Sequence, residues 1–529
     1  MALRFAHQQE GRRDGRVAQP VETALRLGDA PAVRMRSGRF DPALMALFAA
    51  VVSAAGAARP SLWFDEAATI SASTRTLPEL WRLLHNIDAV HGLYYLVMHG
   101  WFTVFPQTEF WSRLSSSLAI AGAAAGVVVL ARQFSGRSVA VCSGVVFAIL
   151  PRITWAGIEA RSYALSTMAV VWLTVLLVAA VRRRRWGWWP VYAVGVAASS
   201  VLNVFVVLMV LVHALVVARL GRRTEIIRWS VATAAAVIAV APFLLYCRTQ
   251  IAQVRWISPL SADTVVEIVA RQYFDHSLGF SLLAGLLLVV SLVCRRTLRF
   301  GEGDRALALL ALAWMTLPTA GLLVYSALLE PVYYPRYLCY TAPAMALLLG
   351  VCIVALARTR ERVAAVVAVL AIAATPNYLM VQRSAYAKEG MDYSQVADVI
   401  TAYAAPGDCL IMDNTANWLP GPIRPMTAAR PGAYAKLADP GRGRTGPQRN
   451  RLWDAHIAIW AVADQVRRCT VLWTVSERDT SVPDRQSGEA LDPGPRLGGA
   501  PAYRVPERLG FHVVERWQFN FAQVTKSTR

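Results

Sequence analysis

The chain has 529 residues, of which 56% are hydrophobic and only 17% are charged. A soluble protein usually carries about a quarter charged residues. Apolar runs of membrane-spanning length recur between Ala43 and Ala374, which excludes an ordinary soluble enzyme. The formal net charge is +20. Such a charge suits nucleic-acid binding, but arginines also accumulate in the cytoplasmic loops of membrane proteins, where they set the orientation of the chain.

Residues 1–40 are rich in arginine, with glycine and proline between, and show no sustained apolar period. We predict a disordered, cytoplasmic tail. The first apolar run begins about forty residues into the chain without a convincing cleavage site, so we expect no cleaved signal peptide.

Eleven apolar stretches within residues 41–378 are predicted to cross the membrane. They are 42–58, 113–131, 138–155, 162–181, 187–202, 203–219, 229–247, 277–294, 305–328, 338–357 and 361–376. The two stretches within 187–219 are also compatible with one long tilted helix. For a further apolar stretch, 91–105, apolar character alone does not establish whether it crosses the membrane.

Arginine clusters between the predicted spans decide the orientation through the positive-inside rule. If 91–105 crossed the bilayer, the run Arg182–Arg185 and most later clusters would lie outside. We therefore expect 91–105 to be an amphipathic or re-entrant helix in a long external loop, 59–112. The chain beyond residue 378 is then external as well.

The same topology accounts for most of the positive charge. The basic residues are spread over the tail and five short cytoplasmic clusters. They form no compact recognition domain, so we expect no nucleic-acid partner. The predicted location is the cytoplasmic membrane, crossed many times, with a cytoplasmic N-terminus.

Residues 379–529 are predicted to form a small external α/β domain with a parallel or mixed sheet. The expected helices are 394–403 and 455–466, the expected strands 409–412, 469–475, 510–514 and 519–524, and the expected loops 436–451 and 480–500. Cys409 and Cys469 begin two of these strands, and either a disulfide or two buried thiols would suit them.

Chemistry-bearing side chains occur in several of the predicted external segments. Asp65 and Glu66 follow Trp63 and Phe64 after the first span, where they either act chemically or favour a helix dipole. His91 precedes Tyr94 and Tyr95, which would also suit an interfacial aromatic belt.

Two further groups open later spans. Glu159, Arg161 and Tyr163 stand close together, and an Arg/Glu pair also closes many helix ends. Tyr334, Arg336 and Tyr337 are the other group, with lipid phosphate as the alternative partner of the arginine. Arg255 beside Trp256 is a weaker candidate, since the pair also suits membrane anchoring.

The predicted spans themselves carry few polar groups, mainly Asn203 and His213. A pump or secondary transporter more often has ionisable groups at mid-membrane. The pattern instead favours a reaction at the outer membrane surface, where a lipid-borne substrate presents its polar head.

The order of these motifs resembles the GT-C superfamily of polytopic glycosyltransferases, and most closely the branch with protein O-mannosyltransferases and lipid A aminoarabinose transferases. Asp65-Glu66 matches the acidic pair of that branch, and His91-Gly92-Leu93-Tyr94-Tyr95 matches its His-Pro-Pro-Leu-Tyr-Tyr-like element without the two prolines. The other matching elements are Arg113-Leu114-Ser115, Glu159-Ala160-Arg161-Ser162-Tyr163-Ala164-Leu165 and Arg336-Tyr337-Leu338. The resemblance covers about residues 41–378, and the C-terminal domain matches no particular family.

The resemblance implies a polyprenyl-phosphate-sugar donor, a glycan, glycolipid or protein acceptor, and an inverting transfer outside the membrane. Asp65 would be the catalytic base, with Glu66 or Glu159 orienting the acceptor or binding a cation. The residues expected to bind the leaving phosphate are Arg161, Arg255 and Arg336, and those expected to line the sugar site are His91, Tyr94, Tyr95, Tyr163, Tyr334 and Tyr337. Some relatives use Mg or Mn, but this sequence does not require a divalent cation.

The resemblance to the mannosyl branch favours mannose as the sugar. The Ala-, Val- and Arg-rich composition is similar to that of actinobacteria, which use mannose and arabinose donors in cell-wall biogenesis. An arabinofuranosyl- or aminoarabinose-type transferase is the first alternative. A flippase or transporter of lipid-linked sugars, with no enzymatic activity, is the second.

Overall fold

The computed structural model describes residues 38–298, 300–414 and 424–529, so the predicted tail lies almost wholly outside the described residues. Seven described segments are long and apolar enough to cross a membrane. Their helices are α5 (Glu109–Arg132), α8 (Tyr163–Arg183), α11 (Arg223–Thr249), α13 (Leu278–Val293), α14 (Glu302–Leu328), α15 (Ala342–Ala357) and α16 (Arg360–Pro376).

Four shorter apolar segments complete the bundle. They are α1 (Asp41–Ala54), α6 (Arg137–Ile149), α9 (Trp188–Leu202), and η2 (Val204–Leu208) continued by α10 (Met209–Leu220). Together the longer and shorter segments correspond, in chain order, to the predicted spans. The predicted fold class, a helical polytopic membrane protein with a small C-terminal sheet domain, is confirmed.

The stretch 187–219 is two helices, so the alternative of one long tilted helix is wrong. The chain turns at Asn203, whose backbone is extended at φ −151° and ψ 111°. Its side-chain oxygen accepts a hydrogen bond from the Phe205 N–H at 3.1 Å. An asparagine side chain that binds a nearby backbone N–H competes with helix formation, which explains the break.

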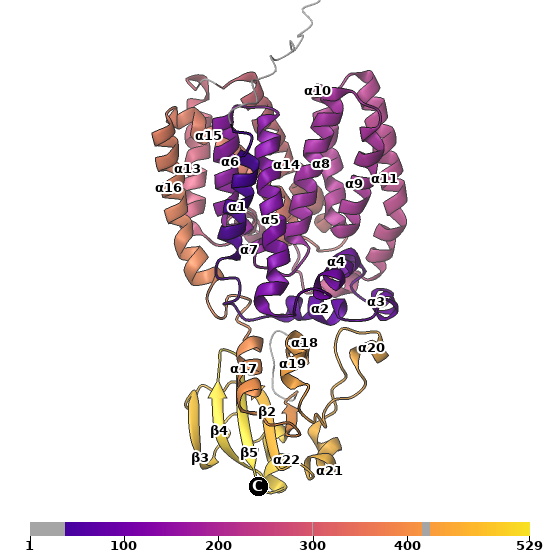
Figure 1. Ribbon diagram of the computed structural model, residues 1–529, viewed down its shortest axis with the longest axis vertical. Helices are drawn as coiled ribbons and strands as arrows, with labels where there is room; N and C mark the ends of the chain where they lie inside the picture. Colours follow the sequence, from indigo (N-terminus) through magenta and orange to yellow (C-terminus); the bar gives the residue numbers. More distant parts are fainter. Residues whose placement is uncertain (1–37, 299, 415–423) are drawn as a thin grey trace, which may run out of the picture. The chain divides into compact units, whose positions relative to one another are not determined.

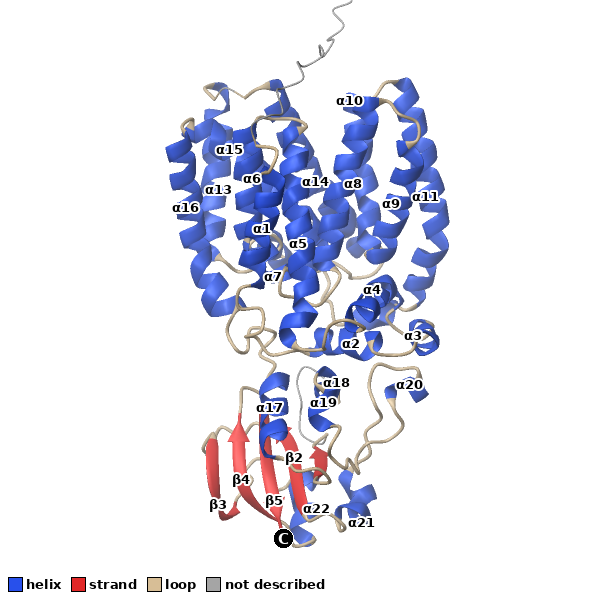
Figure 2. Ribbon diagram, viewed as in Figure 1, coloured by secondary structure: helices blue, strands red, loops and turns tan. Residues whose placement is uncertain are grey.

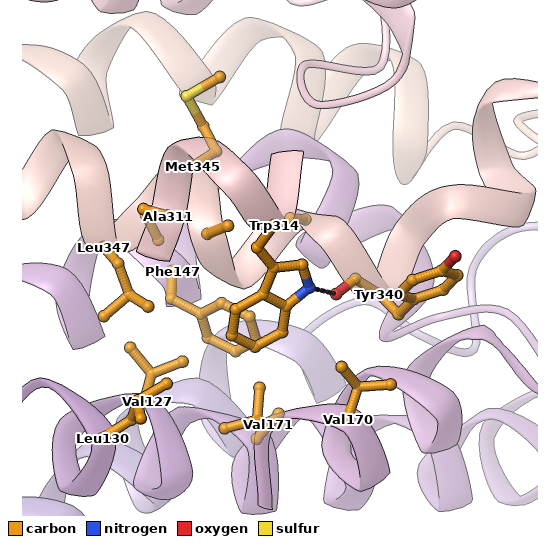
Figure 3. Close-up of a cluster of buried hydrophobic side chains, with 14 of the residues drawn as sticks. Val127, Leu130, Phe147, Val170, Val171, Ala311, Trp314, Tyr340, Met345 and Leu347 are labelled. Atoms are coloured by element: carbon orange, nitrogen blue, oxygen red, sulfur yellow. Dashed lines mark hydrogen bonds between the residues drawn. The ribbon is translucent and has the colours of Figure 1, made fainter. Parts of the chain in front are cut away.

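The bundle core is built from large apolar side chains around Trp314, as Figure 3 shows. The Trp314 indole N–H donates to the backbone oxygen of Tyr340 at 3.1 Å, which satisfies its one polar atom inside the core. The surrounding side chains come from α5, α6, α8, α14 and α15: Val127, Leu130, Phe147, Val170, Val171, Ala311, Met345 and Leu347. Helices α6 and α15 can approach closely at Gly350 because glycine has no Cβ. A Cβ at this position would overlap Ser143.

Three short helices lie across one end of the bundle (Figures 1 and 2). They are α2 (Phe64–Ser73), α3 (Leu77–Leu84) and α4 (Gly92–Phe102). The 11 residues of α4 would extend only about 17 Å, too short for a hydrocarbon core of about 30 Å. This agrees with the expectation that 91–105 does not cross.

Short helical turns connect the longer elements. They are η1 (Ala89–His91), α7 (Pro151–Ala156), η3 (Ile251–Val254), α12 (Asp263–Val266), η4 (Glu267–Arg271), η5 (Cys294–Arg296), η6 (Pro335–Thr341) and η7 (Asn377–Gln382). Of these, η1, η3 and η6 contribute to the site described below.

The C-terminal part holds a five-stranded sheet in the order β1-β2-β5-β4-β3. The strands are β1 (Cys409–Met412), β2 (Val471–Glu477), β3 (Arg485–Leu491), β4 (His512–Gln518) and β5 (Ala522–Thr528). The first two are parallel, with Cys409 opposite Leu472, and the other pairs are antiparallel. The sheet is therefore mixed, one of the two predicted forms.

Helices accompany this sheet: α17 (Tyr393–Tyr403), α18 (Pro425–Ala429), α19 (Pro431–Tyr434), α20 (Gly446–Arg449), η8 (Ile459–Val462), α21 (Ala463–Val466) and α22 (Pro501–Arg508). The first agrees closely with the predicted helix 394–403. Figure 1 shows α17 in front of the upper part of the sheet, and α18 near the end of the bundle that carries α2.

Two predictions for this domain are wrong. The segment 480–500 contains the edge strand β3, whose mostly exposed and polar residues have the composition of a loop. The segment 455–466 is helical only from Ile459 onward. Its first residues pair with the chain at 441–444 instead, since the N–H of Ala455 donates to the Arg444 oxygen at 2.8 Å.

Cys409 and Cys469 form a disulfide, with their Cα atoms 5.9 Å apart. The bond joins the start of β1 to the residues just before β2, so it closes the parallel pair covalently. The other five cysteines are free, and four of them are buried, as expected for packing residues.

We predict that the full-length protein, denatured without reductant, reacts with a maleimide at five of its seven cysteines. After reduction all seven should react. Because the disulfide closes a loop of 60 residues, its loss should destabilise the sheet domain by about 4 kcal/mol. Intact-mass spectrometry and limited proteolysis measure both effects. Seven reactive thiols before reduction would contradict the pairing.

Candidate active site

The two neighbouring acids of α2 lie in different surroundings. Both stand in the first turn of the helix, where their charge also favours the helix dipole. Successive helical residues point about 100° apart, since the helix has 3.6 residues per turn. Asp65 lines a cavity, whereas the Glu66 side chain is fully buried.

Glu66 forms a two-pronged ion pair with Arg113 of α5. The Arg113 Nε donates to Glu66 Oε1 at 2.8 Å and Nη2 donates to Oε2 at 2.6 Å. The remaining Arg113 donors bind the backbone oxygens of Ala57, Pro60 and Ser61. Both side chains have no exposed surface, so Glu66 is placed to position α2 rather than to touch a substrate.

The cavity beside Asp65 has a volume of about 550 Å³, within the usual range for small-molecule sites. Its polar lining includes Asp65, Asp88, His91, Arg161, Tyr163, Gln250, Gln253, Arg336 and Tyr337. Much of the remaining surface is apolar and comes from η2, α11 and α14. The cavity thus joins charged groups at the end of the bundle to an apolar wall between its helices.

Two arginines face Asp65. Arg161 Nε lies 3.8 Å and Arg336 Nη2 lies 3.4 Å from Asp65 Oδ2. The first distance is beyond hydrogen-bonding range and the second is longer than usual for a hydrogen bond. Both Nε atoms are buried without a hydrogen-bond acceptor among the described residues. The two guanidinium groups therefore retain unused donors next to the carboxylate.

Aromatic rings surround the Arg336 guanidinium. Its central carbon lies 5.2 Å from the ring centre of Trp63, 4.8 Å from that of Tyr334 and 5.9 Å from that of Trp256. Ring faces attract a cation at these distances. They also exclude water, which strengthens the arginine's attraction for any anion in the cavity.

Arg161 organises a second chain of contacts. Its Nη2 lies 3.0 Å from His91 Nε2, and its Nη1 donates to the Tyr95 hydroxyl at 3.1 Å. That hydroxyl donates to Asp88 Oδ2 at 2.7 Å. Burial, and then the positive charge of Arg161, holds the pKa of His91 well below its usual value. The imidazole is therefore neutral and accepts from the arginine at Nε2.

Asp88 is a second carboxylate at the cavity, which the sequence did not single out. Its backbone is left-handed at φ 62°, an unusual conformation for a residue other than glycine. The side-chain oxygens of Gln253 and Gln250 accept hydrogen bonds from the N–H groups of Asp88 and Ala89. Burial raises the pKa of the Asp88 carboxyl above its ordinary value. Gln253 of η3 and Gln250, directly before it, thus hold this turn in place.

Glu159 lies behind the cavity rather than in it. It accepts from the Trp63 indole N–H at 2.8 Å and forms a buried ion pair with Lys388. Burial raises the pKa of Glu159 and lowers the pKa of Lys388, while each group's charge opposes the shift of the other. Glu159 therefore orients Trp63, whose ring faces Arg336.

The predicted site residues divide into two groups. Those that line the cavity are Asp65, His91, Arg161, Tyr163, Arg336 and Tyr337. Those outside its lining, within the described part of the chain, are Glu66, Tyr94, Tyr95, Glu159, Arg255 and Tyr334. Tyr95 and Tyr334 contact lining residues, since Tyr95 binds Arg161 and Tyr334 packs on Arg336. Glu159 contacts Trp63 and Lys388, which lie outside the lining. Arg255 is exposed, and its neighbour Trp256 lines the cavity instead.

Several site residues were missed because their signal is not local. Lys388 and Trp453 lie in the C-terminal third of the chain, more than 200 residues from the partners they contact in α2 and at Glu159. Asp88 stands only three residues before His91, so the histidine element marked its neighbourhood. Nothing in the sequence separated it from an ordinary turn residue.

No metal centre is built from the described residues. Across 38–298, 300–414 and 424–529, no group of three or more His, Cys, Asp or Glu side chains is arranged to hold a metal ion. The Asp65 carboxylate already faces two arginines, which is a poor donor set for a divalent cation.

The fold has solved counterparts. The structures of ArnT from Cupriavidus metallidurans in the apo state and bound to undecaprenyl phosphate have TM-scores of 0.57 and 0.55 at 13% and 14% sequence identity. Each comparison covers 92% of this chain and 97% of that chain. The arabinofuranosyltransferase AftD from Mycobacteria has a TM-score of 0.45 at 14% identity, over 92% of this chain and 39% of that chain.

A scan against protein-family models and a search of curated proteins give no match. The likeness to ArnT shows that the chain shares its fold, in agreement with the resemblance of the motifs to the GT-C superfamily.

We predict that Arg113→Met lowers the stability of the protein strongly, because it leaves the buried Glu66 carboxylate without its partner. The expected loss is about 3–5 kcal/mol. Arg442→Ala is the control, since its ion pair with Asp454 is half exposed and should be worth under about 1 kcal/mol. Thermal unfolding in detergent measures both, and an unchanged unfolding temperature for Arg113→Met would contradict the positioning role.

Proposed function

We propose that the protein transfers a sugar from a polyprenyl-phosphate donor to the hydroxyl group of an acceptor at the outer membrane surface. The observation that carries the proposal is the pair of buried arginines, Arg161 and Arg336, whose Nε atoms lack acceptors in the described chain beside Asp65. A phosphate group would supply those acceptors, since arginine binds phosphate through paired hydrogen bonds.

The apolar wall of the cavity suits the lipid part of such a donor. Leu208, Leu244 and Leu322 line it from η2, α11 and α14, which belong to apolar segments of the bundle. A prenyl chain lying there would place its phosphate near the arginines. The structural counterpart ArnT is known bound to undecaprenyl phosphate, which supports a polyprenyl-phosphate donor for this chain.

The proposed reaction is a single displacement at the anomeric carbon. The acceptor oxygen forms a bond to that carbon while the bond from the carbon to the phosphate oxygen breaks. The acceptor proton passes to Asp65, which acts as general base. The bonding electrons leave with the polyprenyl phosphate, whose growing negative charge Arg161 and Arg336 stabilise. Attack opposite the leaving group inverts the anomeric configuration.

The arginines have two partners in this scheme. They face Asp65 at 3.4–3.8 Å and partly neutralise its charge. When a phosphate enters, it competes for the same guanidinium groups, so that Asp65 is paired with them less strongly.

We propose mannose as the sugar, on the likeness of Asp65-Glu66 to the mannosyl branch. An arabinofuranosyl- or aminoarabinose-type transfer is the second candidate.

The proposed external location of the C-terminal domain is supported by the Cys409–Cys469 disulfide, because such bonds persist mainly in oxidising compartments.

We predict that Asp65→Asn reduces transfer by roughly 100- to 1000-fold or more while the protein still inserts and binds the lipid. The amide has nearly the same shape but cannot take up a proton. The assay uses full-length protein in nanodiscs with decaprenyl-phosphate mannose and, separately, decaprenyl-phosphate arabinose. Asp263→Asn, on an exposed carboxylate of α12, is the matched control.

The same assay separates an enzyme from a flippase. A flippase would move the lipid-linked sugar across the bilayer equally well with either residue at position 65. Normal product from the Asn variant would refute Asp65 as the base.

A further inference from the structure

The C-terminal domain contributes to the wall of the cavity. Among the lining residues, Leu452 and Trp453 lie after α20, some 390 residues beyond Asp65 in the chain. Leu452 is buried and Trp453 is half-buried. The surface that a substrate meets is therefore made by two distant parts of the chain.

Ser71 of α2 and Arg75, two residues beyond its end, hold this part of the domain in place. The Ser71 hydroxyl donates to the Leu452 backbone oxygen at 2.6 Å. Arg75 Nη2 donates to the same oxygen at 3.2 Å and to the Arg451 oxygen at 2.5 Å. Arg75 is only 5% exposed, so these bonds are shielded from water. The helix whose first turn carries Asp65 thus leads, through Ser71 and Arg75, to the segment that carries Trp453.

Trp453 meets the cavity beside the first residue of α2. Its ring centre lies 5.3 Å from that of Phe64, with the two ring planes tilted by 59°. Both side chains are half-buried and both line the cavity that contains Asp65. Phe64 directly precedes Asp65, so this aromatic pair stands next to the group that would accept the proton.

We propose that Phe64 and Trp453 form an acceptor subsite that binds a saccharide, so that the C-terminal domain takes part in choosing the acceptor. This rests on the proposed glycosyl transfer and names its acceptor class. The face of an aromatic ring carries negative potential and attracts the polarised C–H groups of a sugar ring. The sugar hydroxyls remain free for polar partners, and one of them can point at Asp65.

The rest of the lining favours a saccharide as well. Asp88, Gln250 and Gln253 add carboxylate and amide groups to the same cavity, and such groups hydrogen-bond well to hydroxyls. The prenyl chain of the donor has its own apolar wall between the bundle helices. That assignment leaves the aromatic pair, one ring of which comes from the C-terminal domain, for the second substrate.

Direct binding tests this subsite without requiring turnover. The probes are methyl mannobioside, methyl arabinobioside and a Ser/Thr-rich peptide, each added to full-length protein in nanodiscs. Saturation-transfer-difference NMR reports binding to the wild type, Trp453→Ala, Trp453→Phe and Trp460→Ala. Trp460 is the matched control, because it lies in the same domain, is 60% exposed and does not line the cavity.

We expect at least one disaccharide to bind the wild type and Trp460→Ala equally well. Binding to Trp453→Ala should weaken by about tenfold, whereas Trp453→Phe should retain most of it. Equal disaccharide binding by Trp453→Ala and the wild type would overturn the subsite. So would binding of the peptide alone, or of no probe at all.

Kinetics separate this proposal from the proposed function. In the transfer assay, Trp453→Ala should raise the acceptor KM by about tenfold and leave the donor KM unchanged. Trp453-dependent disaccharide binding without transfer from any donor would refute the glycosyl transfer and leave the subsite standing. Transfer with an unchanged acceptor KM would refute the subsite alone.

Discussion

The buried ion pair between Glu66 and Arg113 constrains the rest of the site. Two charges without exposed surface are tolerated only when nearly every donor and acceptor is matched, and here the guanidinium group also binds three backbone oxygens. This fixes the start of α2 relative to α5 and to the chain at 57–61. Asp65, which directly precedes Glu66, is thereby directed into the cavity.

Helix α2 is also the link between the bundle and the C-terminal domain. Trp63, Ala67 and Ile70 belong to one buried apolar cluster with residues of α17 and the sheet, including Val396 and Trp473. The carboxylate, the aromatic pair and the contacts of Arg75 therefore depend on a single ten-residue helix. A displacement of α2 would alter the base, the phosphate-facing arginines and the acceptor side together.

The sequence was most informative where physical constraints are local. Apolar runs predicted the helices of the bundle, because hydrophobicity acts residue by residue, and the short helix α4 agrees with the separation of 91–105 from the spans. The order of the motifs predicted that Asp65, His91, Arg161 and Arg336 belong to one site, and all four line the same cavity.

Contacts between distant segments were beyond such reasoning. Asp65 and Glu66 were both predicted to take part in the reaction, as the base and as an acceptor- or cation-binding group, but they lie in different surroundings because helix geometry separates them. Trp453 and Lys388 gave no signal because their partners lie hundreds of residues away. The edge strand β3 was taken for a loop because its exposed residues need no apolar pattern.

The most direct test of the account is an experimental structure of the full-length protein with undecaprenyl phosphate. The account predicts the phosphate within hydrogen-bond distance of Arg161 or Arg336, next to Asp65, with the prenyl chain along the wall formed by η2, α11 and α14. A lipid phosphate bound away from both arginines, or a lipid excluded from the cavity, would contradict it.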